Sequence, residues 1–175
     1  MPAKLARAVG TLLLAVVAIS CDVERETSLQ STDSDDAFKE AQVVRTVDGD
    51  TIIVRVDGKE ERLRYIGIDA PESVTPDQPV ECFGRESSDA NARIVDDGPV
   101  FLEADAEDRD RYGRLLRYVY VPAEDGSMTM VNRYLVEQGY AEAGSYPPNV
   151  RHQDELFAAE SDAIEANRGL WGSCR

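Results

Sequence analysis

The stretch TVDGDTIIVRVDGKEERLRYIGIDAPES, residues 46–73, contains three carboxylates and an arginine that could act together in one site. Asp50, Asp69 and Glu72 are separated in the sequence, so only folding could bring them together. Arg64 lies between the first two of them. Carboxylate oxygens are ligands that Ca²⁺ prefers, and a guanidinium binds phosphate through two parallel hydrogen bonds. These residue types therefore predict a site for a metal ion and a phosphate.

Each of these residues also has a simpler interpretation. An Asp-Gly-Asp sequence more often forms a turn than a metal site, and Asp69 before Ala-Pro-Glu could begin another turn. Arg64 and Arg114 could be surface strand residues that pair with some of the many acids, and such pairs contribute little stability. The only histidine, His152, stands at an acidic helix start and is predicted to lie on the surface. A zinc site or a histidine-based mechanism is therefore not expected.

The elements that position these residues are predicted from hydrophobic patterning and turn signals. Asp57-Gly58 is a two-residue hairpin signal between two of the strands. A buried helical stripe is predicted at Leu156, Ala159, Ala163 and Ile164, in a helix that ends at Gly169. In chain order we expect strands at 41–47, 51–56 and within 56–68, a helix within 85–98, strands at 99–105 and 114–121, and helices within 126–143 and 146–174.

Most connections between these strands are too short for parallel crossovers, which disfavours a doubly wound sheet. The order of elements instead predicts an α+β fold, a five-stranded OB-fold β-barrel with three packed α-helices.

The first 40 residues are predicted to lie outside this domain. Residues 1–20 have a positive start and then an apolar run of about a dozen residues, shorter than the roughly 20 that cross a bilayer, which predicts a signal peptide. The run ends in AISC, which resembles a lipobox that would be lipidated on Cys21, although Ala18 stands where leucine is usual. We therefore expect an exported cell-envelope lipoprotein anchored to the membrane, with a secreted protein as the alternative. Residues 21–40 are interpreted as the lipidated cysteine and a disordered acidic linker, and residues 41–175 as the folded domain.

Two cysteines remain in that domain. Cys82 and Cys174 form a pair in a protein exported to an oxidising side, so we predict a disulfide between them rather than a metal site. The chain carries a formal net charge of −15, and Lys59 is the only lysine after residue 40. This balance argues against avid non-specific binding of nucleic acid but allows a local basic pocket. Nothing in the sequence indicates more than a monomer.

Three segments, VDGDT, RLRYIGIDAPE and DRYGR, resemble the signature segments of the staphylococcal nuclease (thermonuclease) family, in the family's order and at similar separations. VECFG and the closing GLWGSC further resemble exported members. The resemblance implies an OB-fold and a Ca²⁺-dependent phosphodiesterase, an endonuclease that hydrolyses DNA, RNA or both.

The resemblance also implies a role for individual residues. Asp50 and Asp69 match calcium-binding carboxylates, and Ala70 matches a position that contributes its backbone carbonyl. Glu72 matches the proposed general base, and Arg64 and Arg114 match the arginines that hold the scissile phosphate. Substrate contacts are expected from Arg111, Tyr112 and Tyr146.

The chain departs from the family pattern at its substrate surface. Gly144 stands where one of two tyrosines flanks the family's nucleotide pocket, and the segment SVTPDQPVE is acidic or neutral rather than rich in lysine. Two alternatives therefore stay open. The domain could be a catalytically weak or inactive module that binds nucleic acid or protein, or an envelope lipoprotein that only binds Ca²⁺.

Overall fold

The computed structural model describes residues 38–73, 79–96 and 98–174. The predicted signal peptide, the predicted lipidation site Cys21 and the predicted linker up to residue 37 lie outside the described residues. Within the described part of the chain, no helix is long and apolar enough to cross a membrane.

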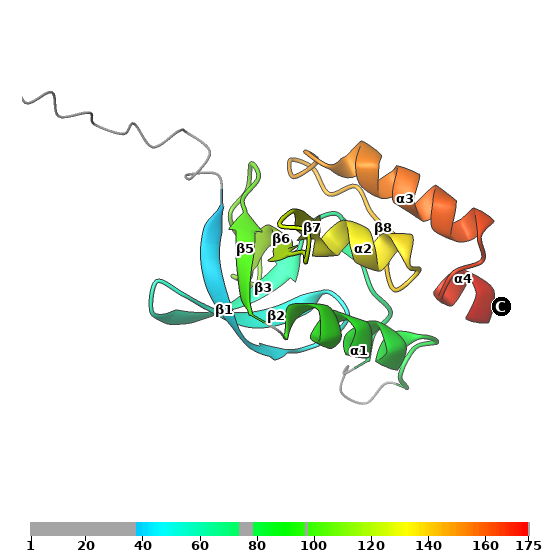
Figure 1. Ribbon diagram of the computed structural model, residues 1–175, viewed down its shortest axis with the longest axis horizontal. Coiled ribbons are helices and arrows are strands. Elements are labelled where there is room, and N and C mark those ends of the chain that lie inside the picture. The colour runs from blue at the N-terminus through cyan, green and yellow to red at the C-terminus, as the bar shows by residue number, and fades with distance from the viewer. Residues whose placement is uncertain (1–37, 74–78, 97, 175) are drawn as a thin grey trace, which may run out of the picture. The chain divides into compact units, whose positions relative to one another are not determined.

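Five strands close into a barrel, as predicted (Figure 1). The order around the barrel is β3-β2-β1-β5-β6, and every neighbouring pair in this order is antiparallel. A parallel pairing of β3 with β6, with Leu63 opposite Leu115, closes it. The strands are β1 (Lys39–Thr46), β2 (Thr51–Val56), β3 (Lys59–Tyr65), β5 (Pro99–Glu103) and β6 (Leu115–Pro122).

The barrel forms because alternate residues of its strands are apolar and point inward. Ile52 and Val54 of β2, and Leu63 and Tyr65 of β3, are almost completely buried. Arg64 lies between the last two residues in sequence, so its side chain points to the other face of β3. The same alternation that builds the core therefore places this arginine outside the core.

Four helices and three short strands complete the described domain. The helices are α1 (Gly84–Val95), α2 (Val131–Glu137), α3 (Gln153–Glu165) and the one-turn α4 (Leu170–Ser173). The first three correspond to the predicted helices. β7 (Met128–Met130) extends the sheet beside β6, and β4 (Ile68–Asp69) pairs with β8 (Glu142–Ala143). Cys82, just before α1, is bonded to Cys174, just after α4, as predicted.

Several predicted boundaries were wrong. β1 begins at Lys39, two residues before the predicted domain start, because Lys39 and Glu40 pair with β5. Residues 128–130, predicted within a helix, form β7 because they pair with β6. α3 ends at Glu165, before Gly169.

The predicted buried stripe of α3 is correct except at its end. Leu156, Ala159 and Ala163 are buried, but Ile164 is 46% exposed. Successive helical residues are about 100° apart around the axis. Ile164 therefore lies beside the covered face that Ala163 occupies.

Candidate functional site

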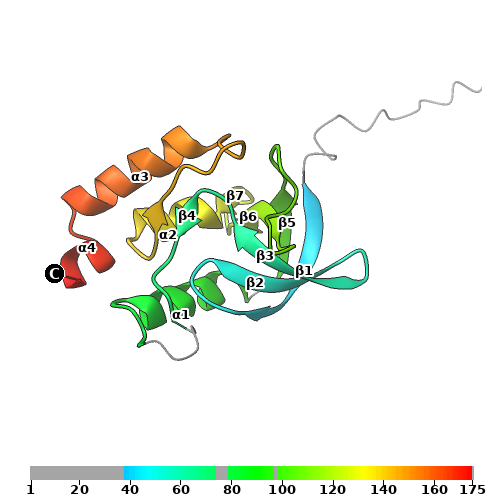
Figure 2. The same cartoon turned by 180° about the vertical axis from the view of Figure 1, so that it is seen from behind.

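The guanidinium of Arg64 lies between two carboxylates that were predicted to bind a metal. Its Nη1 donates to Asp50 Oδ1 and its Nη2 to Asp69 Oδ1, each at 2.5 Å. Nη2 also approaches the carbonyl oxygen of Ile68 at 3.2 Å. The structure thus brings Asp50 and Asp69 together around a positive group, on the side where β3 and β4 lie in front in Figure 2.

The two carboxylates differ in their environment. The side chain of Asp50 is 1% exposed and that of Asp69 is 64% exposed. Burial raises the pKa of Asp50 to about 7, and the neighbouring Asp48 also raises it, against the opposing effect of Arg64. For Arg64, burial lowers the pKa but Asp50 and Asp69 raise it more, so the net shift is upward. Asp50 is therefore a buried carboxyl whose ionised form depends on a nearby cation.

Short polar contacts fix the orientation of the Asp50 carboxylate. Its Oδ2 accepts the backbone N–H of Ala70 at 2.8 Å, and its Oδ1 accepts the hydroxyl of Thr51 at 3.0 Å. The backbone N–H of Asp50 in turn donates to Asp48 Oδ1 at 3.1 Å. The Ala70 bond joins the residue after β4 to the residue before β2, so Ala70 stays next to the two carboxylates.

A cleft of about 390 Å³ opens beside this pair and collects residues from separate segments. Arg64 comes from β3, Glu72 from the segment after β4, Arg114 from the segment before β6, and Tyr146 from the segment before α3. All four were predicted as site residues. Glu72 is exposed, which leaves its carboxylate accessible to water in the cleft.

Arg114 is held at the cleft by a carboxylate four residues earlier. Its Nε lies 2.6 Å from Asp110 Oδ2, and its backbone N–H donates to Asp110 Oδ1 at 3.0 Å. The N–H of Tyr112 donates to the same Oδ1 at 2.9 Å. Burial raises the pKa of Asp110, but these hydrogen bonds together outweigh it and the net shift is downward. Asp110 therefore stays ionised and orients the arginine.

Arg111 and Tyr112 do not line the cleft, although they were predicted to contact substrate. Tyr112 is 68% exposed, and the guanidinium carbon of Arg111 lies 4.7 Å from its ring centroid. The guanidinium carbon of Arg114 lies 5.6 Å from the same ring centroid. The structure therefore places a solvent-exposed aromatic ring next to Arg114, outside the cleft.

Tyr146 lines the cleft and depends on the glycine nearby. A Cβ on Gly144 would lie 2.4 Å from Cε2 of the Tyr146 ring, a distance that real Cβ atoms do not adopt. Burial raises the pKa of Tyr146, and Asp69 raises it further. The departure from the family pattern at position 144 thus makes room for the tyrosine that remains.

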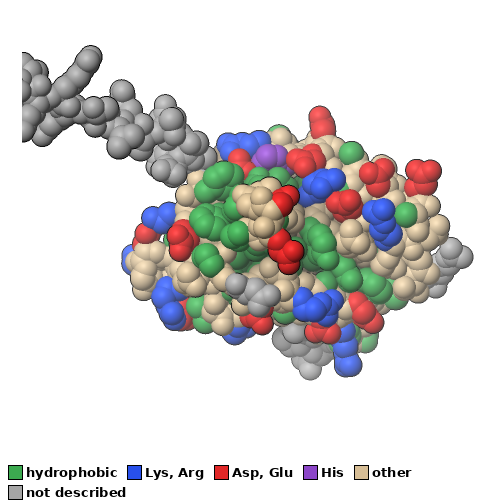
Figure 3. All heavy atoms as spheres, viewed as in Figure 1, with side chains coloured by type: hydrophobic (Ala, Val, Ile, Leu, Met, Phe, Trp, Pro, Cys, Tyr) green, Lys and Arg blue, Asp and Glu red, His purple; other side chains and the backbone are tan. Residues whose placement is uncertain are grey.

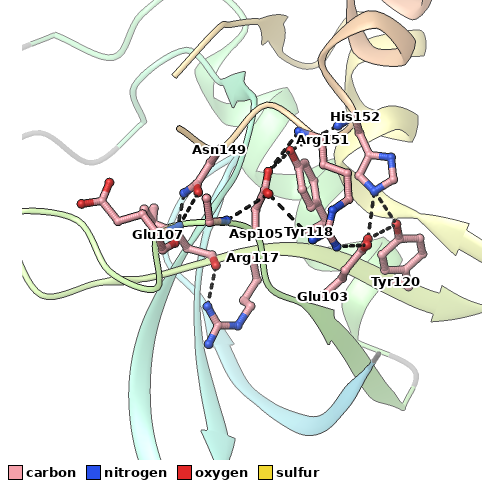
Figure 4. A network of polar contacts seen from close by, with 11 residues as sticks. Glu103, Asp105, Glu107, Arg117, Tyr118, Tyr120, Asn149, Arg151 and His152 are labelled. Atoms are coloured by element: carbon pink, nitrogen blue, oxygen red, sulfur yellow. Dashed lines mark hydrogen bonds and ion pairs between the residues drawn. The ribbon is translucent and has the colours of Figure 1, made fainter. Parts of the chain in front are cut away.

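A polar network fixes the segment that follows Tyr146 against β5 and β6 (Figure 4). The side chain of Asn149 accepts the backbone N–H of Glu107 through Oδ1 at 2.7 Å, and its Nδ2 donates to the carbonyl oxygen of Glu107 at 3.1 Å.

The same network includes His152. Its Nε2 lies 2.9 Å from Glu103 Oε2, which also accepts the Tyr120 hydroxyl at 2.6 Å. His152 was predicted to lie on the surface, and the structure shows it only partly exposed: its side chain is 22% exposed and packs edge-on against Tyr118.

The donor set fits a hard divalent cation. The described residues contain no group of three or more Asp, Glu, His or Cys side chains poised to hold a metal ion. However, the predicted site consists of two carboxylates and the backbone carbonyl of Ala70, all oxygen donors of the kind that Ca²⁺ takes together with water. The two carboxylates already hold a cationic group between them, so their arrangement is compatible with a cation.

A larger cavity, of about 580 Å³, lies elsewhere and lacks such chemistry. Ile94, Val121 and Tyr134 line it together with few charged groups. Hydrophobic side chains gather near the centre of the face seen in Figure 3, the same face as in Figure 1. None of the predicted site residues lines this cavity, so the cleft at Arg64 is the candidate site.

Sequence reasoning did not assign roles to some residues that support the site. Asp48 and Thr51 lie in the segment VDGDT, and Asp110 lies in DRYGR, so both segments contained the signal. An aspartate that bonds backbone N–H groups two and four residues later is typical of a turn. Glu81 gives no such local signal, because its partner Glu72 is nine residues away.

Comparison with known proteins agrees with the family resemblance of the three sequence segments. The family model described as "Staphylococcal nuclease homologue" matches residues 62–173. The chain is 41% identical over 132 residues to a thermonuclease from Staphylococcus hyicus, covering 75% of each chain. It is 35% identical over 165 residues to a thermonuclease from Staphylococcus intermedius, covering 93% of this chain and 95% of that one. It is 36% identical over 128 residues to Endonuclease YncB of Bacillus subtilis (strain 168), covering 73% of this chain and 59% of that one.

Proposed function

The chain belongs to the staphylococcal nuclease family, and we propose that it is a Ca²⁺-dependent endonuclease that hydrolyses phosphodiester bonds of DNA, RNA or both. The observation that carries this proposal is the convergence of Arg64, Glu72 and Arg114 on one cleft, from three separate segments. A binding module would not need an exposed carboxylate in the same cleft as two arginines.

The metal would be held by Asp50, Asp69 and the backbone carbonyl of Ala70. Bound Ca²⁺ would polarise the phosphate and offset negative charge that develops on it. The buried Asp50 carboxylate and the exposed Asp69 carboxylate leave part of such a site open to water and substrate. The hydrogen bond from the Ala70 N–H to the Asp50 carboxylate keeps Ala70 and Asp50 close together.

The two arginines bind and orient the scissile phosphate. A guanidinium can donate two parallel hydrogen bonds to phosphate oxygens, which suits the added charge of a pentacoordinate transition state. Asp110 holds Arg114 by its Nε, which leaves the terminal nitrogens of Arg114 available to substrate. Arg64 donates one hydrogen from each terminal nitrogen to Asp50 and Asp69, and the five N–H groups of a guanidinium leave further donors for a phosphate oxygen.

Glu72 is the proposed general base. Its carboxylate takes a proton from a water molecule, and the water oxygen forms a bond to phosphorus opposite the leaving oxygen. The P–O5′ bond then breaks, and the leaving 5′ oxygen takes up a proton, which gives a 3′-phosphate and a 5′-hydroxyl. The bond that breaks is the one implied by the family resemblance.

Substrate affinity is proposed to be modest at physiological salt. Two aromatic rings are available for nucleotide contacts. Tyr146 lines the cleft, and Tyr112, whose ring contacts Arg111, lies outside it. The net charge of −15 and the acidic neighbours of the arginines weaken attraction to the phosphate backbone. We further propose export as a monomer, with a lipid anchor on Cys21 that lies outside the described residues.

The test is hydrolysis of single-stranded DNA by the purified protein, with Ca²⁺ and with excess chelator. We expect cleavage only with Ca²⁺, and a loss of several orders of magnitude in Glu72→Gln. Glu86→Gln, an exposed carboxyl of α1 outside the cleft, should cleave like the wild type. A folded protein that Ca²⁺ stabilises but that cleaves nothing would favour the binding-module alternative.

A further inference from the structure

We propose that Glu81 is a positioning residue for Glu72. The backbone N–H of Glu81 donates to the carbonyl oxygen of Glu72 at 2.9 Å. In the opposite direction, the backbone N–H of Glu72 donates to Oε2 of the Glu81 side chain, also at 2.9 Å. Two reciprocal bonds therefore clamp the backbone of Glu72 on both its donor and its acceptor.

Glu72 needs such a clamp because regular structure does not hold it. It lies outside the helices and strands and is exposed. The ladder that ends at Asp69 is only two residues long. A bond from a carboxylate to a backbone N–H is charge-assisted and stronger than a neutral one, so Glu81 supplies directional restraint that water does not.

The start of α1 presses against the same peptide. A Cβ on Gly84 would lie 2.5 Å from the carbonyl oxygen of Glu72 and 3.3 Å from that of Pro71. Only glycine permits this approach, and the N–H of Gly84 donates to the carbonyl of Glu81 at 3.0 Å. Glu72 is thus bracketed by Glu81 and Gly84.

The clamp is itself anchored to the rest of the domain. Cys82 is bonded to Cys174, with 5.8 Å between their Cα atoms. The ring of Phe83 stacks on that of Tyr140, with centroids 5.7 Å apart. Glu81 is therefore the first residue of a segment fixed at its next two positions, and a displacement of Glu72 has to break the two bonds of the clamp.

This role for Glu81 rests on the proposed function, in which Glu72 activates water. A misplacement of about 1 Å at a catalytic group can cost on the order of 100-fold in rate. The consequence of losing the clamp should therefore appear in kcat, since Glu81 is not among the residues that line the cleft.

The experiment compares Glu81→Ala and Glu81→Gln with the wild-type protein, and repeats Glu81→Ala in a Glu72→Gln background. We expect kcat of Glu81→Ala to fall by about 10- to 100-fold, with KM and the Ca²⁺ midpoint of cleavage nearly unchanged. Glu81→Gln keeps an acceptor oxygen and should recover most of the rate. In the Glu72→Gln background the second substitution should have no further effect, because Glu81 acts through Glu72.

Full activity of Glu81→Ala would overturn the proposal. So would a double variant whose kcat falls by the full effects of Glu81→Ala and Glu72→Gln combined. Amide hydrogen exchange separates this inference from the proposed function, because the N–H of Glu72 should exchange at least about tenfold faster in Glu81→Ala even without substrate. Unchanged exchange would overturn the clamp itself. A wild-type protein without Ca²⁺-dependent cleavage would instead overturn the proposed function, and with it the catalytic meaning of the clamp.

Discussion

Arg64 donates to Asp50 at 2.5 Å, so the residue proposed to bind the phosphate is bonded to a residue proposed to bind the metal. Its second terminal nitrogen makes an equal bond to Asp69. The guanidinium therefore occupies the space between the two carboxylates that a cation would share. In the proposed site, Ca²⁺ would compete with the guanidinium for Asp50 and Asp69, so we expect these contacts to rearrange when the ion binds.

Arg64→Gln should therefore separate metal binding from catalysis. Without the competing guanidinium, we expect Ca²⁺ to bind about tenfold more tightly, which corresponds to ~1.4 kcal/mol. Cleavage should fall by at least about 100-fold, because the phosphate loses a charged donor. Isothermal titration with Ca²⁺ and a single-stranded DNA assay measure the two effects. Arg62→Gln, at an exposed position on the same strand, is the control, and weaker Ca²⁺ binding by Arg64→Gln would contradict the competition.

Asp110 should matter for catalysis through Arg114. Asp110→Ala removes the acceptor of the Arg114 Nε and of two backbone N–H groups. We expect kcat/KM to fall by roughly 10-fold or more, since the arginine loses its orientation at the cleft. Steady-state kinetics test this, with Asp89→Ala on exposed α1 surface as the control. Equal kinetics in Asp110→Ala and the wild type would show that Arg114 orients itself.

Much of the barrel and of the site was predictable from local patterns. The Asp-Gly-Asp turn and the alternation around Arg64 follow from residue order, because side chains alternate along a strand. Membership of the five strands in a barrel follows from the short connections between them.

The remaining features depend on tertiary contacts. Nothing local indicates that Arg64 bridges Asp50 and Asp69, since the two carboxylates meet only after the chain folds and the Ala70 N–H bonds to Asp50. Met128–Met130 form a strand because β6 offers an edge, not because of their own pattern. His152 is partly buried because Glu103, 49 residues earlier, accepts its bond.

Gly144→Ala should alter substrate binding more than stability. The added Cβ would displace the Tyr146 ring, which lines the cleft. We expect KM for single-stranded DNA to rise by about 5- to 10-fold, the lower end of the range for one lost base–aromatic contact, with a smaller change in kcat. Tyr146→Ala should give a similar rise, and the double variant no more than either single one. Additive effects would mean that position 144 acts independently of Tyr146.

Glu103 should stabilise the fold in a pH-dependent manner. Burial raises its pKa, but hydrogen bonds from Tyr120, Arg151 and His152 together lower it below the usual value. A carboxyl whose folded pKa is depressed contributes stability that is fully present above its unfolded pKa of about 4.3 and is lost as the pH falls through the folded pKa. Glu103→Gln should thus lower the unfolding free energy at pH 7 by about 1–3 kcal/mol.

The difference between this variant and the wild type should shrink as the pH falls below about 4, where the wild-type carboxyl becomes protonated. Urea denaturation at several pH values measures it. Glu124→Gln, an exposed carboxyl at another site, should show no such trend. If the difference in unfolding free energy between Glu103→Gln and the wild type stayed constant down to about pH 2, Glu103 would act by packing rather than by charge.

The Cys82–Cys174 disulfide should stabilise the domain and also preserve the geometry at Glu72. The two cysteines are 92 residues apart, and a cross-link that closes so long a loop removes much entropy from the unfolded chain. Replacing both cysteines by serine should lower the unfolding free energy by about 2–4 kcal/mol. Because Cys82 directly follows Glu81, kcat should also fall at temperatures where the variant is still folded. Parallel thermal unfolding and single-stranded DNA kinetics test both parts, and a destabilised variant with wild-type kcat would show that Phe83 and Gly84 suffice to anchor the segment.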